Sequence, residues 1–162
     1  TKNSRLIASE SFRLSYNFLY KKKKNNIKQI NKLANASLLV GKAMNITRTT
    51  APHALSYNLT AHFGIPHGLA VALLMKYILK INLNKLGNSD KKRKILKLFK
   101  SRSLNDLIYK YEKIMSFNKS NYKLNLPDKK INKMSKEINI ERLSNNPVFL
   151  SNHEIVDIYK SL

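Results

Sequence analysis

Three of the four histidines in this 162-residue sequence lie in one stretch, HALSYNLTAHFGIPHG, which begins at His53 and contains His67 near its end. Imidazole nitrogens bind divalent cations and carry protons near neutral pH. On an unbroken helix, His53 and His67 would lie about 21 Å apart, too far to share a ligand. Gly64 permits unusual backbone angles, and the residue before Pro66 is disfavoured in a helix. We therefore predict a helix, a sharp turn and a second helix that bring both imidazoles to one divalent cation.

Each histidine also has an ordinary structural alternative. His53 could simply pack in a helical core, and His67 could bond a neighbouring carbonyl group. His62 follows His53 by nine residues, on the opposite face of a helix, so we expect a surface residue there. His153 falls inside a helix-capping motif and is expected to be exposed.

A carboxylate is missing from the neighbourhood of these histidines. Catalytic divalent sites normally use three or more protein ligands, commonly histidines together with a carboxylate. The sequence has no Asp or Glu from Ser11 through Ser89. Either the histidines bind no metal, or a further ligand comes from Glu10, from the C-terminal half, or from polypeptide outside these residues.

Composition limits the class of protein. The length and the 43% hydrophobic content suffice for one core, so we expect a single domain over residues 1–162. No apolar run reaches the roughly 18 residues that a membrane span needs, and no secretion signal is recognisable, which predicts a cytoplasmic protein without a membrane partner. The absence of Cys excludes disulfides and thiolate metal sites. Because a helical pattern begins almost at Thr1, we expect a fragment of a longer protein.

The formal net charge of +22, from 31 Lys and Arg against 9 Asp and Glu, raises the alternative of a basic helical module that binds nucleic acid. Specific nucleic-acid binders usually add clustered arginines or aromatic platforms for bases. Here the lysines are spread along the chain, in segments 21–26, 82–94 and 118–123, without such clusters. Nucleic acid is therefore the less favoured partner.

Apolar residues recur at helical spacing along nearly the whole chain, which predicts an all-α fold without strands. The first helix is expected to start at a Ser4 cap and to end near the KKKKNN run, and the second to span residues 27–46. The side chains expected to face inward on these two helices are Leu6, Ile7, Phe12, Leu14, Phe18, Ile27, Ile30, Leu33, Leu38 and Val40. Close approach of a neighbouring helix is expected at Ala34, Ala36, Gly41 and Ala43.

Further helices are predicted from capping residues. Thr49 or Thr50 is expected to cap the helix that carries His53, with Pro52 in its first turn, and an apolar helix resumes at Gly68. The remaining predictions are a helix over 90–100 capped by Ser89, a helix over 104–115 capped by Ser103, a polar loop over 117–127, and a final helix with a Ser151–Glu154 capping box.

The stretch TTAPHALSYNLTAHFGIPHGLAVALLMKYILKIN resembles the metal-site signature of the iron-containing, group III alcohol dehydrogenases, in which Pro-His-Gly opens a second helix after one that carries a His. NKLANASLLVGKAMNIT and SNNPVFLSNHEIVDIYKSL are similar to the preceding helix and to the C-terminal end of that family. The resemblance covers nearly the whole chain. The segments TTAPHALSY and FGIPHG are most similar to those of the phosphonoacetaldehyde-reductase-like branch of the family.

The resemblance implies an all-helical, metal-binding C-terminal domain that lacks the family's N-terminal α/β dinucleotide-binding domain. His53 and His67 would be two of four metal ligands, and an Asp and a His preceding Thr1 would be the others. The implied cofactors are a divalent metal, Fe²⁺ or Zn²⁺, and NAD(H) or NADP(H). The implied partners are a small aldehyde or alcohol substrate, the missing N-terminal domain and a second subunit of a homodimer. Activity of the chain alone is not expected.

Tyr57 departs from the family pattern. Many relatives carry a second His four residues after the first ligand, near the nicotinamide, so Tyr57 is the expected cofactor-binding residue here. A phenol, with an ordinary pKa of about 10, is a poorer proton shuttle than imidazole at neutral pH. The alternative is a tyrosine that only packs on its helix. Arg48 could meet the charge of a phosphonate, or could be an ordinary exposed arginine.

Overall fold

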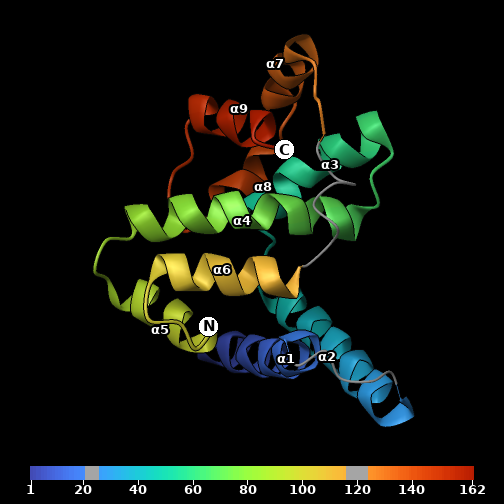
Figure 1. Cartoon of the computed structure of the whole chain (residues 1–162), viewed down its shortest axis with the longest axis vertical. Helices are drawn as coiled ribbons and strands as arrows, with labels where there is room; N and C mark the ends of the chain where they lie inside the picture. Colours follow the sequence, from blue (N-terminus) through green and yellow to red (C-terminus); the bar gives the residue numbers. More distant parts are fainter. Residues whose placement is uncertain (21–25, 116–123) are drawn as a thin grey trace. The chain divides into compact units, whose positions relative to one another are not determined.

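A computed structural model describes residues 1–20, 26–115 and 124–162 (Figure 1). Within these ranges all regular structure is helical, which confirms the predicted all-α fold. No helix of the described residues is both long and apolar enough to cross a membrane. The helices are α1 Lys2–Tyr20, α2 Ile27–Ile46, α3 Ala51–Phe63, α4 His67–Lys85, α5 Asp90–Leu98, α6 Leu104–Ile114, α7 Asp128–Lys136, α8 Ile140–Ser144 and α9 Asn152–Lys160.

The helices form two compact units. One consists of Thr1–Arg48 and Asn88–Ile114, which contain α1, α2, α5 and α6. The other consists of Thr49–Gly87 and Met115–Leu162, with α3, α4, α7, α8 and α9. The expectation of a single domain over residues 1–162 stays a prediction.

In the first unit, α1 and α2 pack against each other through small side chains. Ala36 and Ala43 are the buried residues of α2, as predicted, whereas Ala34 and Gly41 are exposed. The buried hydroxyl of Ser11 donates a hydrogen bond of 2.7 Å to the Ala36 carbonyl oxygen, so it ties one helix to the backbone of the other. Small residues at this contact let the two helix backbones approach closely.

The predicted inward face of α2 is wrong. Ile27, Ile30 and Leu38 are 75%, 51% and 59% exposed, and Val40 is exposed as well. On α1, the inward prediction also fails at Leu6, which is exposed. The physical reason is that the helix pair uses its small residues, and these lie on a different side of α2 from the large apolar ones.

An aromatic cluster joins α1 to the segment after α5. The rings of Phe12 and Phe99 lie 4.7 Å apart, and those of Tyr16 and Phe99 lie 5.9 Å apart in an edge-on arrangement. The Tyr16 hydroxyl donates to the Phe99 carbonyl oxygen at 3.0 Å. Leu107 of α6 is fully buried. This unit therefore has a small core of its own.

The second unit contains the larger core, which α3, α4, α7 and α9 share. Its fully or almost fully buried side chains include Leu55, Leu59, Leu74, Ile78, Ile131, Met134, Ile155, Ile158 and Tyr159. The Tyr159 hydroxyl donates to the Leu55 carbonyl oxygen at 2.9 Å, and burial raises the pKa of Tyr159 to about 12. Asn58 likewise donates to the Met134 carbonyl oxygen at 2.9 Å. These polar contacts fix α9 and α7 against α3.

Most predicted helix caps are confirmed. The side chains of Ser89 and Ser103 accept from the backbone N–H groups three residues on, and Ser151 with Glu154 forms the predicted capping box. The first cap is wrong, because α1 begins at Lys2 and Thr1 Oγ1 accepts the N–H of Ser4 at 3.1 Å.

Two short helices and one cap escaped prediction. The sequence pattern does not predict α7 or α8. It also predicts only a lysine-rich turn at Asn26, whereas the Asn26 side chain caps α2 by accepting from the Gln29 N–H. Residues 21–25 of that turn and residues 117–123 of the predicted polar loop lie outside the described residues.

Candidate metal centre

The break between α3 and α4 lies at the predicted Gly-Pro turn. Gly64 adopts a left-handed conformation, with φ 65°, and its N–H donates to the Thr60 carbonyl oxygen at 3.0 Å to close the end of α3. A non-glycine residue is strained at this angle, so Gly64 suits this C-cap. Pro66 caps α4 and His67 is its first residue. Figure 1 shows α3 and α4 as separate helices that turn back at this point.

This turn brings the two predicted ligands together. The ring centroids of His53 and His67 lie 5.5 Å apart, with an angle of 56° between the ring planes. Both side chains are half-buried. The distance is far shorter than the roughly 21 Å expected along a continuous helix. The structure therefore places the imidazoles side by side, as the turn at Gly64 and Pro66 predicted.

Ser56 orients the second imidazole. Its fully buried hydroxyl donates to the His53 carbonyl oxygen at 3.0 Å and lies 3.3 Å from Nδ1 of His67. A Ser56 hydroxyl that donates to the carbonyl can only accept from His67, and this pairing requires the His67 tautomer with its proton on Nδ1. That tautomer leaves the Nε2 lone pair of His67 free to bind a ligand. Metal-binding histidines commonly donate their other ring N–H in this way.

The environment of His53 favours its neutral form. Burial lowers the pKa of His53 below its ordinary value, and the neighbouring His67 and Arg142 lower that pKa further. A neutral imidazole is the form that binds metal ions, because a protonated ring has no lone pair to offer.

Tyr57 and Arg142 lie beside the imidazoles. The Tyr57 ring stacks on the His67 ring with a centroid distance of 5.1 Å, and the Arg142 guanidinium lies 4.9 Å from the centre of the Tyr57 ring. Arg142 also donates hydrogen bonds to the Tyr57 hydroxyl and, at 3.5 Å, to Thr49 Oγ1. A cation is thus held close to the start of α3. The stacked ring and the hydrogen-bonded hydroxyl agree with the alternative of a tyrosine that packs on its helix, and a role of Tyr57 at the cofactor stays a prediction.

The other two histidines and Glu10 have partners elsewhere. His62 lies 3.2 Å from Glu137, and His153 is mostly exposed and lies 3.0 Å from Asp157, both consistent with their expected structural roles. Glu10 pairs with Arg13 on α1. Among the described residues there is no group of three or more His, Cys, Asp or Glu side chains that could hold a metal ion.

The imidazole pair fits part of a metal site. Two imidazoles on one tetrahedral ion, each with its nitrogen about 2.0 to 2.1 Å away, have ring centroids roughly 5 Å apart. The 5.5 Å separation of His53 and His67 agrees with this value. Imidazole nitrogens suit Fe²⁺ or Zn²⁺, and the pair supplies two of the three or four donors that such an ion needs.

Sequence reasoning missed Ser56 and Arg142. Ser56 lies three residues after His53, one helical turn along, and this spacing could have identified it as a hydroxyl near the first ligand. Arg142 is 85 residues from Tyr57, and no local signal connects the two. Arg48, which was considered for an anionic substrate, is exposed.

Known proteins resemble this chain in fold and in sequence. The structure is similar to a crystal structure of an iron-containing alcohol dehydrogenase from Thermotoga maritima, with a TM-score of 0.76 and 23% identity over 99% of this chain. The chain covers 42% of the length of that protein. A search of curated proteins found no match. A model of the Fe-containing alcohol dehydrogenase family, C-terminal, matches residues 14–162. Because this match spans most of the sequence, the chain belongs to the Fe-containing alcohol dehydrogenase family and corresponds to its C-terminal, helical part.

Proposed function

We propose that this chain is the metal-binding helical part of an NAD(P)-dependent alcohol dehydrogenase or aldehyde reductase, with His53 and His67 as two ligands of one Fe²⁺ or Zn²⁺ ion. The observation that supports this most directly is the convergence of the two rings, 5.5 Å apart, across the turn between α3 and α4. The family match agrees with the reaction class.

The residues of this chain would orient the reactants. A bound divalent ion would act as a Lewis acid on the oxygen of an aldehyde or alcohol. His53 and His67 would hold that ion, and Ser56 would keep His67 in the tautomer that presents Nε2. Tyr57, stacked on His67 and partly exposed, is the side chain that we expect against the nicotinamide.

An anionic substrate is the more specific part of this proposal. A phosphonate-bearing aldehyde such as phosphonoacetaldehyde would need a cation close to the imidazoles. Arg142 meets this need better than Arg48, because the Arg142 guanidinium lies over the Tyr57 ring and donates to the Tyr57 hydroxyl. A guanidinium suits phosphonate because it can donate two parallel hydrogen bonds to its oxygens.

The chain alone is proposed to be inactive. Hydride transfer needs a bound nicotinamide dinucleotide, and the family's glycine-rich segment for its pyrophosphate has no counterpart among these residues. A separate or connected α/β domain would supply it. An assay of this chain with NADH or NADPH and an aldehyde should show no turnover, and turnover would contradict this part of the proposal.

Metal binding can be tested with the chain as it is. Zn²⁺ is titrated into the protein while NMR follows the imidazole proton signals of all four histidines. We expect the His53 and His67 signals to shift together and at lower Zn²⁺ concentration than those of His62 and His153, which serve as internal controls.

Variants make this test specific. His53→Ala should abolish the low-concentration response of His67, whereas His62→Ala should leave it unchanged. Ser56→Ala should weaken Zn²⁺ binding about tenfold, because an outer-shell partner of a ligand typically contributes that much. Equal responses from all four histidines, or undiminished binding when both His53 and His67 are replaced by Ala, would refute the site.

A further inference from the structure

A groove runs between α1 and α2 in the first compact unit. Its volume is about 510 Å³, and it is open along its length to one side of the helix pair. Its lining combines apolar and small hydroxyl side chains, namely Ala8, Ser11, Phe12, Ser15, Leu33, Ala36, Ser37 and Val40. No charged side chain of the residues that the structure describes lines it. Small residues on both walls leave room for an inserted side chain or for the close approach of a third helix.

The groove is continuous with an exposed apolar stripe on α2. Ile27, Ile30 and Leu38 point outward, and Ala34 and Gly41 fall between and after them at spacings of three and four residues. Residues at these spacings share one face of a helix. Val40 is exposed and also lines the groove, so it connects the two surfaces. Stripe and groove together form one apolar surface, which we call the α2 surface.

The spacing of the α2 surface indicates a helical occupant. From Ile27 to Gly41 it extends about 21 Å along the helix axis, which matches three to four turns of a partner helix. Apolar residues three and four apart along a helix face are the pattern by which one amphipathic helix binds another. Exposed large apolar patches of this kind mark interaction sites.

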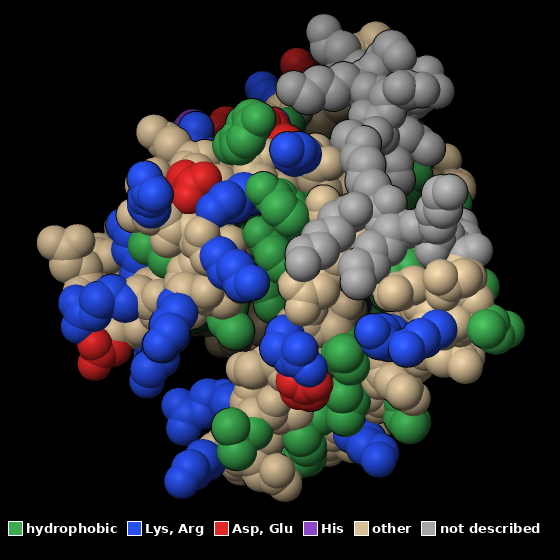
Figure 2. Space-filling model, turned by 60° about the horizontal axis from the view of Figure 1, so that its bottom comes forward, with side chains coloured by type: hydrophobic (Ala, Val, Ile, Leu, Met, Phe, Trp, Pro, Cys, Tyr) green, Lys and Arg blue, Asp and Glu red, His purple; other side chains and the backbone are tan. Residues whose placement is uncertain are grey.

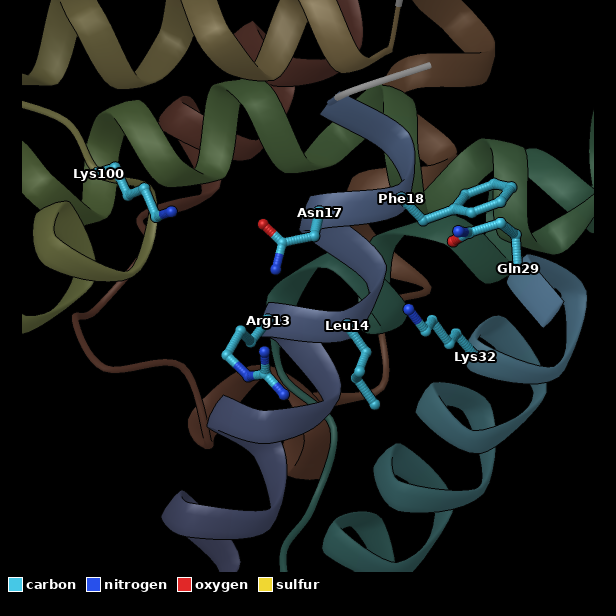
Figure 3. Close-up of a pocket in the computed structure, with 7 residues that line it drawn as sticks. All are labelled: Arg13, Leu14, Asn17, Phe18, Gln29, Lys32 and Lys100. Atoms are coloured by element: carbon cyan, nitrogen blue, oxygen red, sulfur yellow. The ribbon is translucent and has the colours of Figure 1, made fainter. Parts of the chain in front are cut away.

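The charges around the α2 surface indicate the chemistry of its partner. Helices α1 and α2 carry six Lys and Arg side chains and a single carboxylate, Glu10. That carboxylate pairs with Arg13, which lines a different pocket together with Lys32 and Lys100. Figure 3 shows Lys32 extending from α2 toward α1, and Lys100 reaching in from the turn after α5. The helix pair therefore carries six cationic side chains against one carboxylate, and on α2 itself the charged side chains are all lysines.

A second copy of this chain would fit the α2 surface poorly. Two α2 helices placed face to face would bring Lys28 and Lys42 of each copy near those of the other, and α2 has no acidic side chain to pair with them. The formal net charge of +22 adds long-range repulsion. Figure 2 shows Lys and Arg side chains interspersed with exposed hydrophobic ones, and few acidic ones, over the face in view.

From these observations we propose that the α2 surface binds an amphipathic helix of a second polypeptide, whose apolar stripe is flanked by Glu and Asp side chains. The apolar stripe would cover Ile30, Leu38 and Val40, and the acidic flanks would meet the lysines of α2. This inference does not depend on a metal at His53 and His67, and either proposal can fail without the other.

Synthetic helices test the proposal on the intact chain. One peptide of about 20 residues carries Leu at heptad a and d positions with Glu on both flanks. A second has the same Leu pattern with Lys flanks, and a third has the Glu flanks with Ser in place of Leu. Binding is measured by fluorescence anisotropy at low and at high salt, and by sedimentation for self-association of the chain.

Matched variants locate the binding surface. Ile30→Glu combined with Leu38→Glu should weaken binding of the Glu-flanked peptide at least tenfold, because burying one large aliphatic side chain is worth about that factor. Ile140→Glu is the control, since Ile140 of α8 is also highly exposed, at 78%. Photo-cross-links from the Glu-flanked peptide should map to α1 and α2, which checks the site without any substitution.

The outcomes are distinct. Binding of only the Glu-flanked Leu peptide, lost in the double variant and kept in the control, supports the proposal. Equal binding of the Lys-flanked peptide would refute the charge argument. No binding of any peptide, or cross-links outside α1 and α2, would refute the proposal that the α2 surface binds a helix. Self-association that Ile30→Glu with Leu38→Glu abolishes would assign the α2 surface to a second copy instead.

Discussion

The helix pairs α1–α2 and α3–α4 are built from adjacent stretches of sequence, yet they bury very different amounts of apolar surface. Seven of the 13 residues of α3 are buried, against two of the 20 residues of α2. In the α3–α4 pair, α7, α8 and α9 supply further side chains that cover the apolar faces. For α2, the described residues provide a neighbour mainly on its small-residue face.

The difference shows that an apolar stripe in the sequence indicates which face of a helix can be buried. It does not indicate which other element buries that face. For α3 and α4 the covering helices come from the C-terminal part of the same chain. For α2 the stripe of Ile27, Ile30 and Leu38 is left exposed. This contrast is the basis of both proposals: the covered pair positions the imidazoles, and the uncovered helix offers a docking surface.

The largest expected effect is the loss of stability when a leucine is replaced by alanine in the α3–α4 pair, compared with the α1–α2 pair. Leu55→Ala should destabilise the fold by about 2–5 kcal/mol, because it opens a cavity at a fully buried position. Leu38→Ala should change stability by less than about 0.5 kcal/mol, because that side chain is largely exposed. Urea denaturation followed by circular dichroism measures both. Similar losses for the two variants would show that α2 is covered in solution.

Replacing a glycine by alanine should change the free energy of unfolding in opposite directions in the two helix pairs. Gly64→Ala should cost about 1–2 kcal/mol, because its left-handed φ strains any side chain although the surrounding space is open. Gly41→Ala should stabilise α2 by about 0.5–1 kcal/mol, since a Cβ there meets no atom within 4 Å and no positive φ is needed. Thermal unfolding of both variants provides the comparison, and a stabilising Gly64→Ala would exclude the tight turn.

Removing a buried hydroxyl group should change the stability of each helix pair by a smaller amount. Ser11→Ala should cost roughly 1 kcal/mol, because it removes the buried bond to the Ala36 carbonyl that joins α1 to α2. In α3, the hydroxyl of Thr60 is buried and has no hydrogen-bond partner among the described residues. Thr60→Val keeps the shape and removes that oxygen, so it should be neutral or stabilising by up to about 1 kcal/mol. A loss of stability in Thr60→Val would indicate a partner for this hydroxyl.

The smallest expected effect concerns acid stability. The Lys85 ammonium, followed by the Ser151 backbone N–H, lowers the pKa of Glu154 below its ordinary value of 4.5. The stabilisation that the ionised Glu154 carboxylate provides is therefore complete above pH 4.5, and it is lost as the pH falls through the lowered pKa of Glu154. Glu154→Gln should flatten the fall in unfolding free energy as the pH decreases below 4.5. Glu10→Gln, which removes a more exposed carboxylate from α1, should change this slope less.

Local signals allowed much of the fold to be predicted. Residues 27–46 form α2 as expected, and Ser89, Ser103 and Ser151 cap their helices. The turn at Gly64 could be predicted because backbone angles depend on residues adjacent in sequence. The proximity of His53 and His67 followed from that turn alone.

The remaining features depend on distant contacts. The apolar residues of α2 cover a broad face, and periodicity does not show that the helix would pack through Ala36 and Ala43 instead. Arg142 reaches Tyr57 through the fold of the C-terminal helices, which no spacing in the sequence encodes. Short helices such as α8 have too few residues for a periodic pattern.

The exposed stripe of α2 also determines how concentrated solutions of this protein should respond to salt. At low ionic strength, the net charge of +22 keeps copies apart. The Debye length falls from about 10 Å at 0.1 M salt to about 3 Å at 1 M, so added salt removes this repulsion while the attraction between apolar side chains persists. Solubility should consequently decrease as salt is added, and purification at modest ionic strength should limit self-association.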